Sequence, residues 1–174
     1  MESTFVNKIA DSGIITLNLE DFYPKKNVVV FDMKDHLFMG LILKEKDFRE
    51  ALKILDTNIY ENKIVALTCS ADAVIPMWAY MLVTSLLQPI ATEIIFGTDA
   101  IVKEQKLLQN IAAINEMQYT NARVVIKGCG ELPIGEAAYT AITQKLRPVA
   151  KSIMYGEPCS TVPVFKKKTV PNAS

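Results

Sequence analysis

The sequence predicts an α/β fold in which a mainly parallel sheet is flanked by helices. Short apolar, strand-like runs alternate with amphipathic helical stretches, and this pattern is typical of βαβ units. The segment 64–97 is also similar in sequence to the segment 124–156. We therefore expect an internal duplication of a strand-helix-strand-helix unit. Identical residues 59 positions apart form the pairs Tyr80/Tyr139, Thr84/Thr143, Leu87/Leu146, Pro89/Pro148, Ala91/Ala150 and Gly97/Gly156.

The two predicted repeat units cover about residues 28–97 and 94–156, so they share one strand. The first helix of each unit begins at a Lys-Glu pair, at Lys44 and again at Lys103. Cys69 and Cys129 are 60 positions apart, which means that the second unit lacks one residue between its cysteine and its helix. Right-handed crossovers should place the helices over the sheet. The strands expected to run parallel are those around Val29, Val65, Ile94, Val125 and Ile153.

The two ends of the chain are predicted to lie at the edges of the sheet. From Ile15 to Leu19, apolar and polar residues alternate with the period of a half-exposed strand, which we expect to be an antiparallel edge. The run from Val28 to Phe31 is continuously β-branched or aromatic, as in a strand covered on both faces. The tail 157–174 contains Pro158 and Pro163, so we expect an extended C-terminal arm or an edge strand.

Helix periodicity accounts for the stretches between the strands. Phe48, Leu52 and Leu55 form one apolar stripe, and Leu107 and Ile111 continue the same pattern in the second unit. The second helix of each unit places a tyrosine on its inner stripe. We interpret these tyrosines, Tyr80 and Tyr139, as core residues together with Trp78 and the methionines.

Composition predicts one globular domain, residues 1–174, in a reducing cytoplasm. Half of the residues are hydrophobic and 22% are charged, which leaves apolar surface for a homo-oligomer. Lys plus Arg equals Asp plus Glu at 19 each, so no global field attracts nucleic acid or an anionic membrane. Three cysteines argue against a disulfide scaffold, and the N-terminus has no signal-peptide pattern.

One segment has the length and composition of a membrane span. Residues 73–92 contain no charge, and a bilayer-spanning helix needs about 20 apolar residues. The matching segment of the second unit carries Glu136, Lys145 and Arg147. Because two copies of one unit should share an environment, we predict a buried core helix and no membrane span.

The three cysteines are the candidate functional residues. In parallel sheets, ligands bind beyond the carboxyl ends of the strands. Cys69 ends one predicted strand, Cys129 ends another between two glycines, and Cys159 follows the last strand. We therefore expect the three thiols at one rim of the sheet.

Thiols near helix N-termini have lowered pKa values, and a thiolate is both a nucleophile and a metal ligand. Three converging thiolates suit a soft metal, an incompletely bound iron–sulfur cluster or a sulfur relay. Cys129 and Cys159 are the predicted attachment points and catalytic thiols, with Cys69 as a third ligand and Glu157 as a base. The alternative is that free cysteines fill core space, which is their commonest use.

Other polar residues carry weaker signals. Asp32 follows its strand directly and either supplies a carboxylate to the rim or caps a turn. His36 is the only histidine and is interpreted as a surface loop residue. No Ser-His-Asp ordering can be built from this one histidine. Helix starts at Ser70, Thr98 and Gly130 leave an anion-binding enzyme as a third hypothesis.

Several segments resemble a bacterial family known mainly from Bacteroidetes, the domain of unknown function 2480. They are SGIITLNLEDFYP, LFMGLILKEKDFREAL, TCSADAVIPMWAYMLV, KGCGELP and LRPVAKSIMYGEPCSTVPVFK. The resemblance runs from about Phe5 to Lys167. It implies no established activity and no catalytic residue. It does imply a genomic context near iron–sulfur assembly genes.

Besides the anion-binding enzyme, two main hypotheses follow from the sequence. Whether the chain is an enzyme stays open. The first is an accessory or carrier in iron–sulfur or sulfur handling that works with iron–sulfur assembly proteins through the cysteine site. The second is a non-catalytic, homo-oligomeric interaction module in which the cysteines are structural and the charge-free helix is buried at a dimer face.

Overall fold

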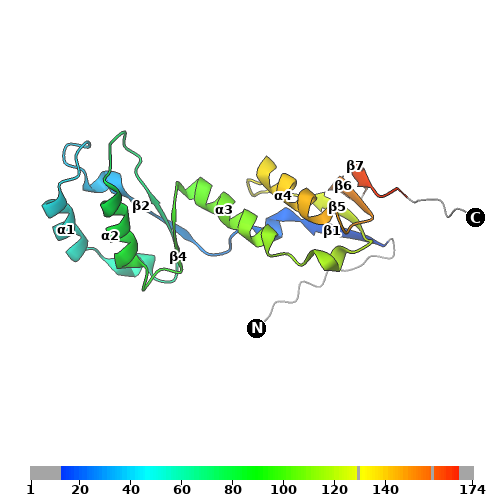
Figure 1. Cartoon of the computed structure of the whole chain (residues 1–174), viewed down its shortest axis with the longest axis horizontal. Helices are drawn as coiled ribbons and strands as arrows, with labels where there is room; N and C mark the ends of the chain where they lie inside the picture. Colours follow the sequence, from blue (N-terminus) through cyan, green and yellow to red (C-terminus); the bar gives the residue numbers. More distant parts are fainter. Residues whose placement is uncertain (1–12, 129, 158, 169–174) are drawn as a thin grey trace, which may run out of the picture. The chain divides into compact units, whose positions relative to one another are not determined.

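The computed structural model describes residues 13–128, 130–157 and 159–168. The chain divides into two compact units. We call Pro24–Gln105 the inserted unit, because it interrupts the outer unit, which consists of Met1–Tyr23 and Lys106–Ser174. The division falls within helix α3 (Asp99–Ala112). In the described residues, the α/β prediction is confirmed with four α-helices, but the strands form two sheets, so the expectation of a single sheet is wrong (Figure 1).

The inserted unit contains a three-stranded parallel sheet in the order β2-β3-β4. The strands are β2 (Val28–Asp32), β3 (Ile64–Thr68) and β4 (Glu93–Phe96). Helix α1 (Glu45–Lys53) connects β2 to β3, and α2 (Met77–Leu87) connects β3 to β4. Both connections are the crossovers that parallel neighbours require.

Strand β3 is apolar without alternation because both of its faces are covered. Val65 and Leu67 belong to the core that α1 and α2 cover, with Phe48 and Val83 among its members. Ile64 and Ala66 point to the opposite face and pack with Val102 of α3. Both faces of this strand are therefore buried. The sequence predicted such cover for residues 28–31, but that prediction is wrong, because β2 lies at the edge of the sheet and Val30 is 44% exposed.

The outer unit contains a four-stranded sheet in the order β1-β5-β6-β7. The strands are β1 (Ile14–Asn18), β5 (Arg123–Lys127), β6 (Ser152–Glu157) and β7 (Ser160–Lys166). Helix α4 (Glu136–Leu146) connects β5 to β6. Strand β7 is antiparallel to β6, which confirms the edge-strand alternative for this part of the tail.

Strand β1 corrects the prediction of an antiparallel N-terminal edge. It is parallel to β5, with Ile15 opposite Val124. Alternation of apolar residues reveals a half-exposed strand but not its direction. The connection between these two strands contains the whole inserted unit, and a long connection of this kind permits parallel pairing.

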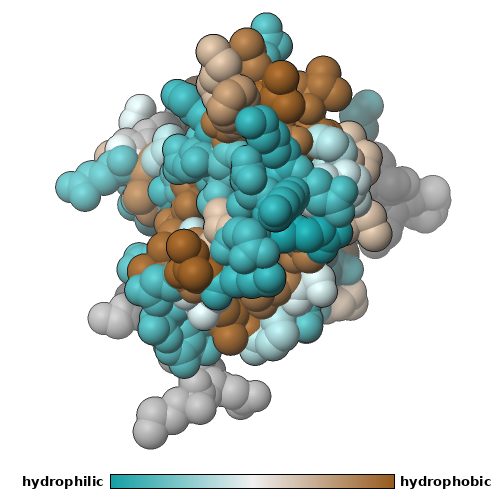
Figure 2. Space-filling view, turned by 90° about the vertical axis from the view of Figure 1, so that its left-hand side faces the viewer, coloured by the Kyte–Doolittle hydropathy of each residue, from teal (hydrophilic) through white to brown (hydrophobic). Residues whose placement is uncertain are grey.

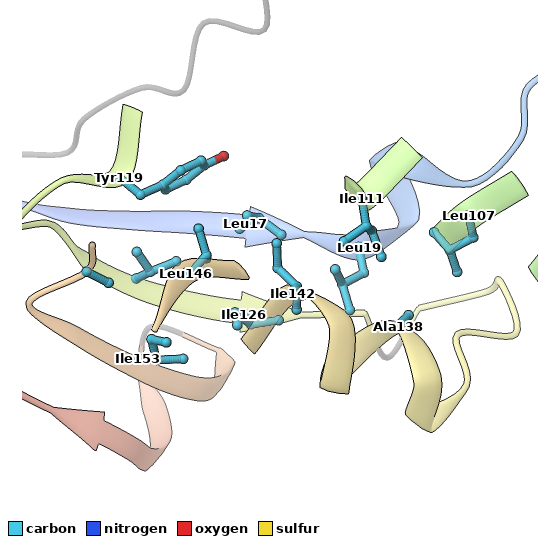
Figure 3. Close-up of a cluster of buried hydrophobic side chains, with 12 residues drawn as sticks. Leu17, Leu19, Leu107, Ile111, Tyr119, Ile126, Ala138, Ile142, Leu146 and Ile153 are labelled. Carbon is cyan, nitrogen blue, oxygen red and sulfur yellow. The ribbon is translucent and has the colours of Figure 1, made fainter. Parts of the chain in front are cut away.

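The core of the outer unit lies between this sheet and two helices. Figure 3 shows side chains of β1 and β5 meeting those of α3 and α4. The matched stripes on the helices predicted this contact, because residues three and four apart share a helix face. The core residues labelled in Figure 3 are Leu17, Leu19, Leu107, Ile111, Tyr119, Ile126, Ala138, Ile142, Leu146 and Ile153.

Residues 59 positions apart adopt similar local conformations in the two units. The 3-10 turns η3 (Thr57–Tyr60) and η4 (Glu116–Tyr119) each end in a buried tyrosine and are capped by Asp56 and by Asn115. Asn62 and Asn121 follow them, and both have a φ of 57°.

The predicted repeat units, about 28–97 and 94–156, do not coincide with the two compact units of the chain. The proposed units shared the strand that is now β4, but β4 pairs with β3 in the inserted unit. In the outer unit, the strand that pairs with β5 and comes before α3 in the sequence is β1. The first strand of the outer unit therefore comes from the N-terminal side of the inserted unit.

Candidate functional site

Asp32 organises the carboxyl edge of the sheet in the inserted unit. Its Oδ1 accepts the backbone N–H of Lys34 at 3.0 Å and thereby caps η2 (Met33–His36). The same oxygen accepts the backbone N–H of Ser70 at 2.9 Å, from the loop that follows β3. Of the two predicted roles for Asp32, the structure shows the turn cap. The same carboxylate also binds the loop that follows the neighbouring strand, β3.

The surroundings of Asp32 favour its charged form. Burial by itself raises the pKa of this carboxyl group, but hydrogen bonds from the hydroxyl and N–H of Ser70 and from Lys34 outweigh that effect. The pKa of Asp32 therefore lies below its ordinary value, and the group is ionised at neutral pH.

Cys69 lies directly after β3 and is half-buried. Its Sγ donates to the carbonyl oxygen of Ala71 at 3.6 Å. Burial raises the pKa of the Tyr80 hydroxyl, and the negative charges that Cys69 and Asp32 carry when ionised raise it further. Cys69, Asp32 and Tyr80 are thus electrostatic neighbours at one sheet edge. Tyr80 was predicted as a core residue, but it is half-buried and makes an edge-to-face contact with Phe96, with ring centroids 5.5 Å apart.

Glu157 and Cys159 lie at the corresponding edge of the outer unit. Lys127 ends β5 and Glu157 ends the adjacent parallel strand β6, and Lys127 Nζ is 3.4 Å from Glu157 Oε2. Glu157, the predicted base, is therefore exposed and ion-paired. Cys159 is exposed in the turn between β6 and β7. Cys129 lies outside the described residues.

The predicted cysteine site falls on both units of the chain and stays a prediction. Cys69 belongs to the inserted unit and Cys159 to the outer unit. The expectation of a shared rim depended on one continuous sheet, and that premise is wrong. The described part of the chain contains no group of three His, Cys, Asp or Glu residues that could hold a metal ion.

The helix starts proposed as anion sites are engaged by groups of the chain itself. The Ser70 N–H donates to Asp32, and the Thr98 hydroxyl accepts the N–H of Ile101 at 3.4 Å. The loop after β5 encloses the carboxylate of Glu20, whose Oε1 accepts the N–H of Leu132 at 3.2 Å. A Cβ at Gly130 would overlap that carboxylate. No local pattern predicts a contact between positions this far apart in the sequence.

His36 is not the surface residue that its isolation suggested. It is half-buried, stacked on Phe31 with ring centroids 5.2 Å apart, and it meets Phe48 edge-on at the same distance. Burial lowers its pKa, while the charge of Asp35 opposes that shift. The reason for the difference is that η2 turns the ring inward, over the start of the core.

Sequence reasoning missed a group of exposed apolar side chains on the inserted unit. The run Leu37–Leu43 contains no polar side chain. It forms a tight hairpin in which Phe38 N donates to Ile42 O at 2.8 Å, and Met39 adopts a φ of 53°. Met39 is 81% exposed at its tip.

The loops after β2, β3 and β4 lie at the same edge, because these strands are parallel. We call the exposed apolar residues of these loops, together with Met77 at the start of α2 and Phe96 at the end of β4, the apolar edge. Figure 2 shows hydrophobic side chains gathered at the top of the molecule, where Figure 1 places the loops after β2 and β3. The apolar edge consists of Phe38, Met39, Leu41, Ile42, Val74, Met77 and Phe96.

The charge-free segment 73–92 contributes only an 11-residue helix, α2. Ala79, Val83 and Leu87 are buried, as predicted, whereas Met77 and Met81 are exposed. Within the described residues, no helix has both the length and the hydropathy needed to cross a membrane.

Comparison with known proteins identifies a family. The family model described as "Protein of unknown function (DUF2480)" matches residues 3–167 of the chain. Neither the curated proteins nor the solved structures include a significant match.

Proposed function

We propose a function from the geometry alone, because the chain belongs to the DUF2480 family, which is described as a family of proteins of unknown function. The function is that of a non-catalytic interaction module. The apolar edge of the inserted unit binds a second copy of the chain.

One observation carries this proposal. The residues 59 positions after Val74 and Met77 are Pro133 and Glu136, and both of these counterparts are exposed. At these two places the outer unit therefore carries a proline or a charged side chain, as an ordinary solvated surface does, whereas the counterpart of Phe96 is Tyr155, which is 39% exposed. Val74 is 92% exposed in the inserted unit. Large apolar side chains grouped at one edge indicate a surface that a partner covers.

The chemistry of the edge favours a second copy as that partner. A two-fold axis places the same surface against itself, so charged residues would face their own kind. The side chains of the apolar edge carry no charge, which lessens this repulsion, and the Lys44 ammonium lies over the Phe38 ring, 3.3 Å from its centroid. Burial of apolar surface stabilises association by roughly 25 cal/mol per Å².

Sedimentation equilibrium of the full chain tests the proposal. Wild-type protein should be dimeric at micromolar concentration, and Met39→Glu should shift it to the monomer. Met117→Glu is the matched control, because Met117 is exposed in the outer unit and should leave the dimer intact. A monomeric wild type at 100 micromolar, an order-of-magnitude limit for a weak interface, would remove the proposal.

A thiol site is the second candidate function, supported by the neighbouring Cys69, Asp32 and Tyr80. In this alternative, the chain is a cytoplasmic accessory or carrier for iron–sulfur assembly proteins. A soft metal, an iron–sulfur cluster or sulfane sulfur would be its cargo, attached at Cys129 and Cys159, with Cys69 as third ligand and Glu157 as base. Exposure of Cys159 supports access to such a cargo. Anaerobic purification with metal and labile-sulfide analysis tests it, and protein free of both would count against it.

The internal duplication is a further part of the proposal. The matched geometry of Asn62 and Asn121, and of Gly97 and Gly156, whose φ values are 147° and 119°, supports an origin of both units from one. A duplicated module that retains an apolar surface in one copy alone gives the chain a single docking edge. Expression of Pro24–Gln105 by itself, followed by hydrogen exchange, tests whether this unit folds autonomously; an unfolded fragment would weaken the idea.

A further inference from the structure

The inserted unit contains a groove between α1 and α2 that is separate from the apolar edge. Leu52, Leu82 and Leu86 line it, and Arg49 and Lys53 lie along its α1 side. Helix α2 contains no charged residue. The groove is therefore apolar along its α2 side, and the charged residues that line it are both cationic.

The outer unit shows that this fold does not require such a groove. Lys145 lies 59 positions after Leu86, and its Nζ donates to the carbonyl oxygen of Ala112 at 2.8 Å. The same Nζ is 3.1 Å from Glu116 Oε2. At this place in the outer unit, a lysine connects α4 to the end of α3. In the inserted unit, leucine replaces it and leaves apolar surface instead.

The cations beside the groove are held by weak contacts. Arg49 pairs with Glu45 at 2.9 Å and Lys53 pairs with Glu50 at 2.8 Å, and both pairs are largely exposed. Exposed ion pairs contribute little free energy, so they can be exchanged for a partner's carboxylates. The Arg49 guanidinium is also 5.4 Å from the centre of the Trp78 ring, which places it on the α2 side of α1.

We propose that this groove binds an amphipathic helix of a partner protein that carries acidic residues along one side. Leu82 and Leu86 are four residues apart on α2, which suits apolar anchors at i, i+3 or i+4 and i+7 of a helix laid in the groove. The partner's carboxylates lie against Arg49 and Lys53, and its other side, beside α2, is uncharged. Charge complementarity thus sets the orientation of the bound helix.

A designed peptide is the probe. It is a labelled helical peptide of about four turns with leucines at i, i+4 and i+7 and glutamates along one side. A second peptide carries lysines in place of the glutamates. Fluorescence anisotropy with the full chain should show at least about tenfold tighter binding of the acidic peptide, with a difference that decreases as salt screens the charges. Equal binding of the two peptides, or none, would overturn the proposal.

Variants assign the binding to the groove. Leu86→Lys introduces the residue that the outer unit already tolerates at the matching position, and it should weaken binding about tenfold or more while circular dichroism stays unchanged. Met81→Lys, on the exposed stripe of α2 outside the groove, is the matched control and should bind normally. Arg49→Glu with Lys53→Glu should reverse the preference towards the lysine peptide. Binding that survives Leu86→Lys, or a preference that does not change with the charges, would contradict the assignment.

Self-association is measured on the same proteins. Loss of the dimer in Leu86→Lys, with no peptide binding by the wild type, would make a second copy the occupant and overturn the helix proposal. Loss of the dimer in Met39→Glu with peptide binding intact is the expected result. A monomeric wild type that still binds the acidic peptide would remove only the proposed homo-oligomer.

Discussion

The Asp32 carboxylate accepts the backbone N–H of Ser70 at 2.9 Å and so joins the ends of two neighbouring parallel strands. The same oxygen caps the turn that follows β2, through the N–H of Lys34. One oxygen atom therefore satisfies two backbone donors at the carboxyl end of this sheet. Cys69 and the apolar edge lie at the same end.

Replacement of Asp32 should depend on whether an acceptor remains. Asp32→Ala leaves both N–H groups without this partner and should lower the free energy of unfolding by about 1–2 kcal/mol. Asp32→Asn retains Oδ1 and should cost less than half of that, since Asn18 caps η1 (Leu19–Phe22) in the same way. Urea unfolding at pH 7 measures both. Equal losses for the two variants would mean that charge, and not the acceptor, is what matters.

Acid should remove the contribution of the Asp32 charge. The pKa of Asp32 in the folded chain lies below its ordinary value, so the stabilisation is present above that value and is lost as pH falls through the folded pKa. The stability difference between wild type and Asp32→Asn should therefore shrink below about pH 4. Unfolding curves from pH 3 to pH 7 check this, and a constant difference would contradict it.

His36 should make the fold less stable in mild acid. Burial between Phe31 and Phe48 lowers its pKa, so the unfolded chain binds a proton before the folded chain does. Its effect is absent above the ordinary histidine value of about 6.5. Below that pH it lowers the free energy of unfolding, by no more than about 1 kcal/mol for a half-buried group. His36→Phe should reduce the loss between pH 7.5 and pH 5, and an unchanged loss would assign it to other groups.

Gly156 should tolerate alanine much less well than Gly13. Both have a positive φ, but a Cβ at Gly156 would lie 2.6 Å from the backbone oxygen of Ser160, whereas none would be met within 4 Å at Gly13. We expect a loss of at least about 2 kcal/mol for Gly156→Ala and about 1 kcal/mol for Gly13→Ala. Thermal unfolding of both variants measures the difference. Similar losses would show that the turn between β6 and β7 adjusts.

The two cysteines in the described residues should react at different rates. Cys159 is exposed, whereas Cys69 is half-buried and donates to Ala71. Under native conditions, iodoacetamide should alkylate Cys159 at least about tenfold faster, because access limits the reaction at Cys69. Peptide mass spectrometry at timed intervals measures both rates, and unfolding in urea should remove the difference. Faster reaction at Cys69 would instead reveal an activated thiolate and favour the thiol site.

Parts of the candidate sites were predictable from local patterns and parts were not. Cys69 lies directly after a strand, as the sequence predicted, because strand ends are set by local residue types. The position of Glu20 against the loop at Gly130 was not predictable, because it connects distant segments. The groove between α1 and α2 at Leu86 was also not predicted from the sequence. A comparison with Lys145, 59 positions after Leu86, would have pointed to it, since α2 and α4 share alanine, tyrosine, threonine and leucine at matching positions but differ at this one.

By itself, the sequence determined the α/β class and the helix faces. These follow from periodicity, which each segment expresses through its own neighbours. Tertiary structure alone decided that the strands form two sheets and that β1 pairs with β5 across the inserted unit. The physical reason is that closing a longer loop costs only slightly more entropy, so strand pairing depends on the packing of both partners and not on their separation along the chain.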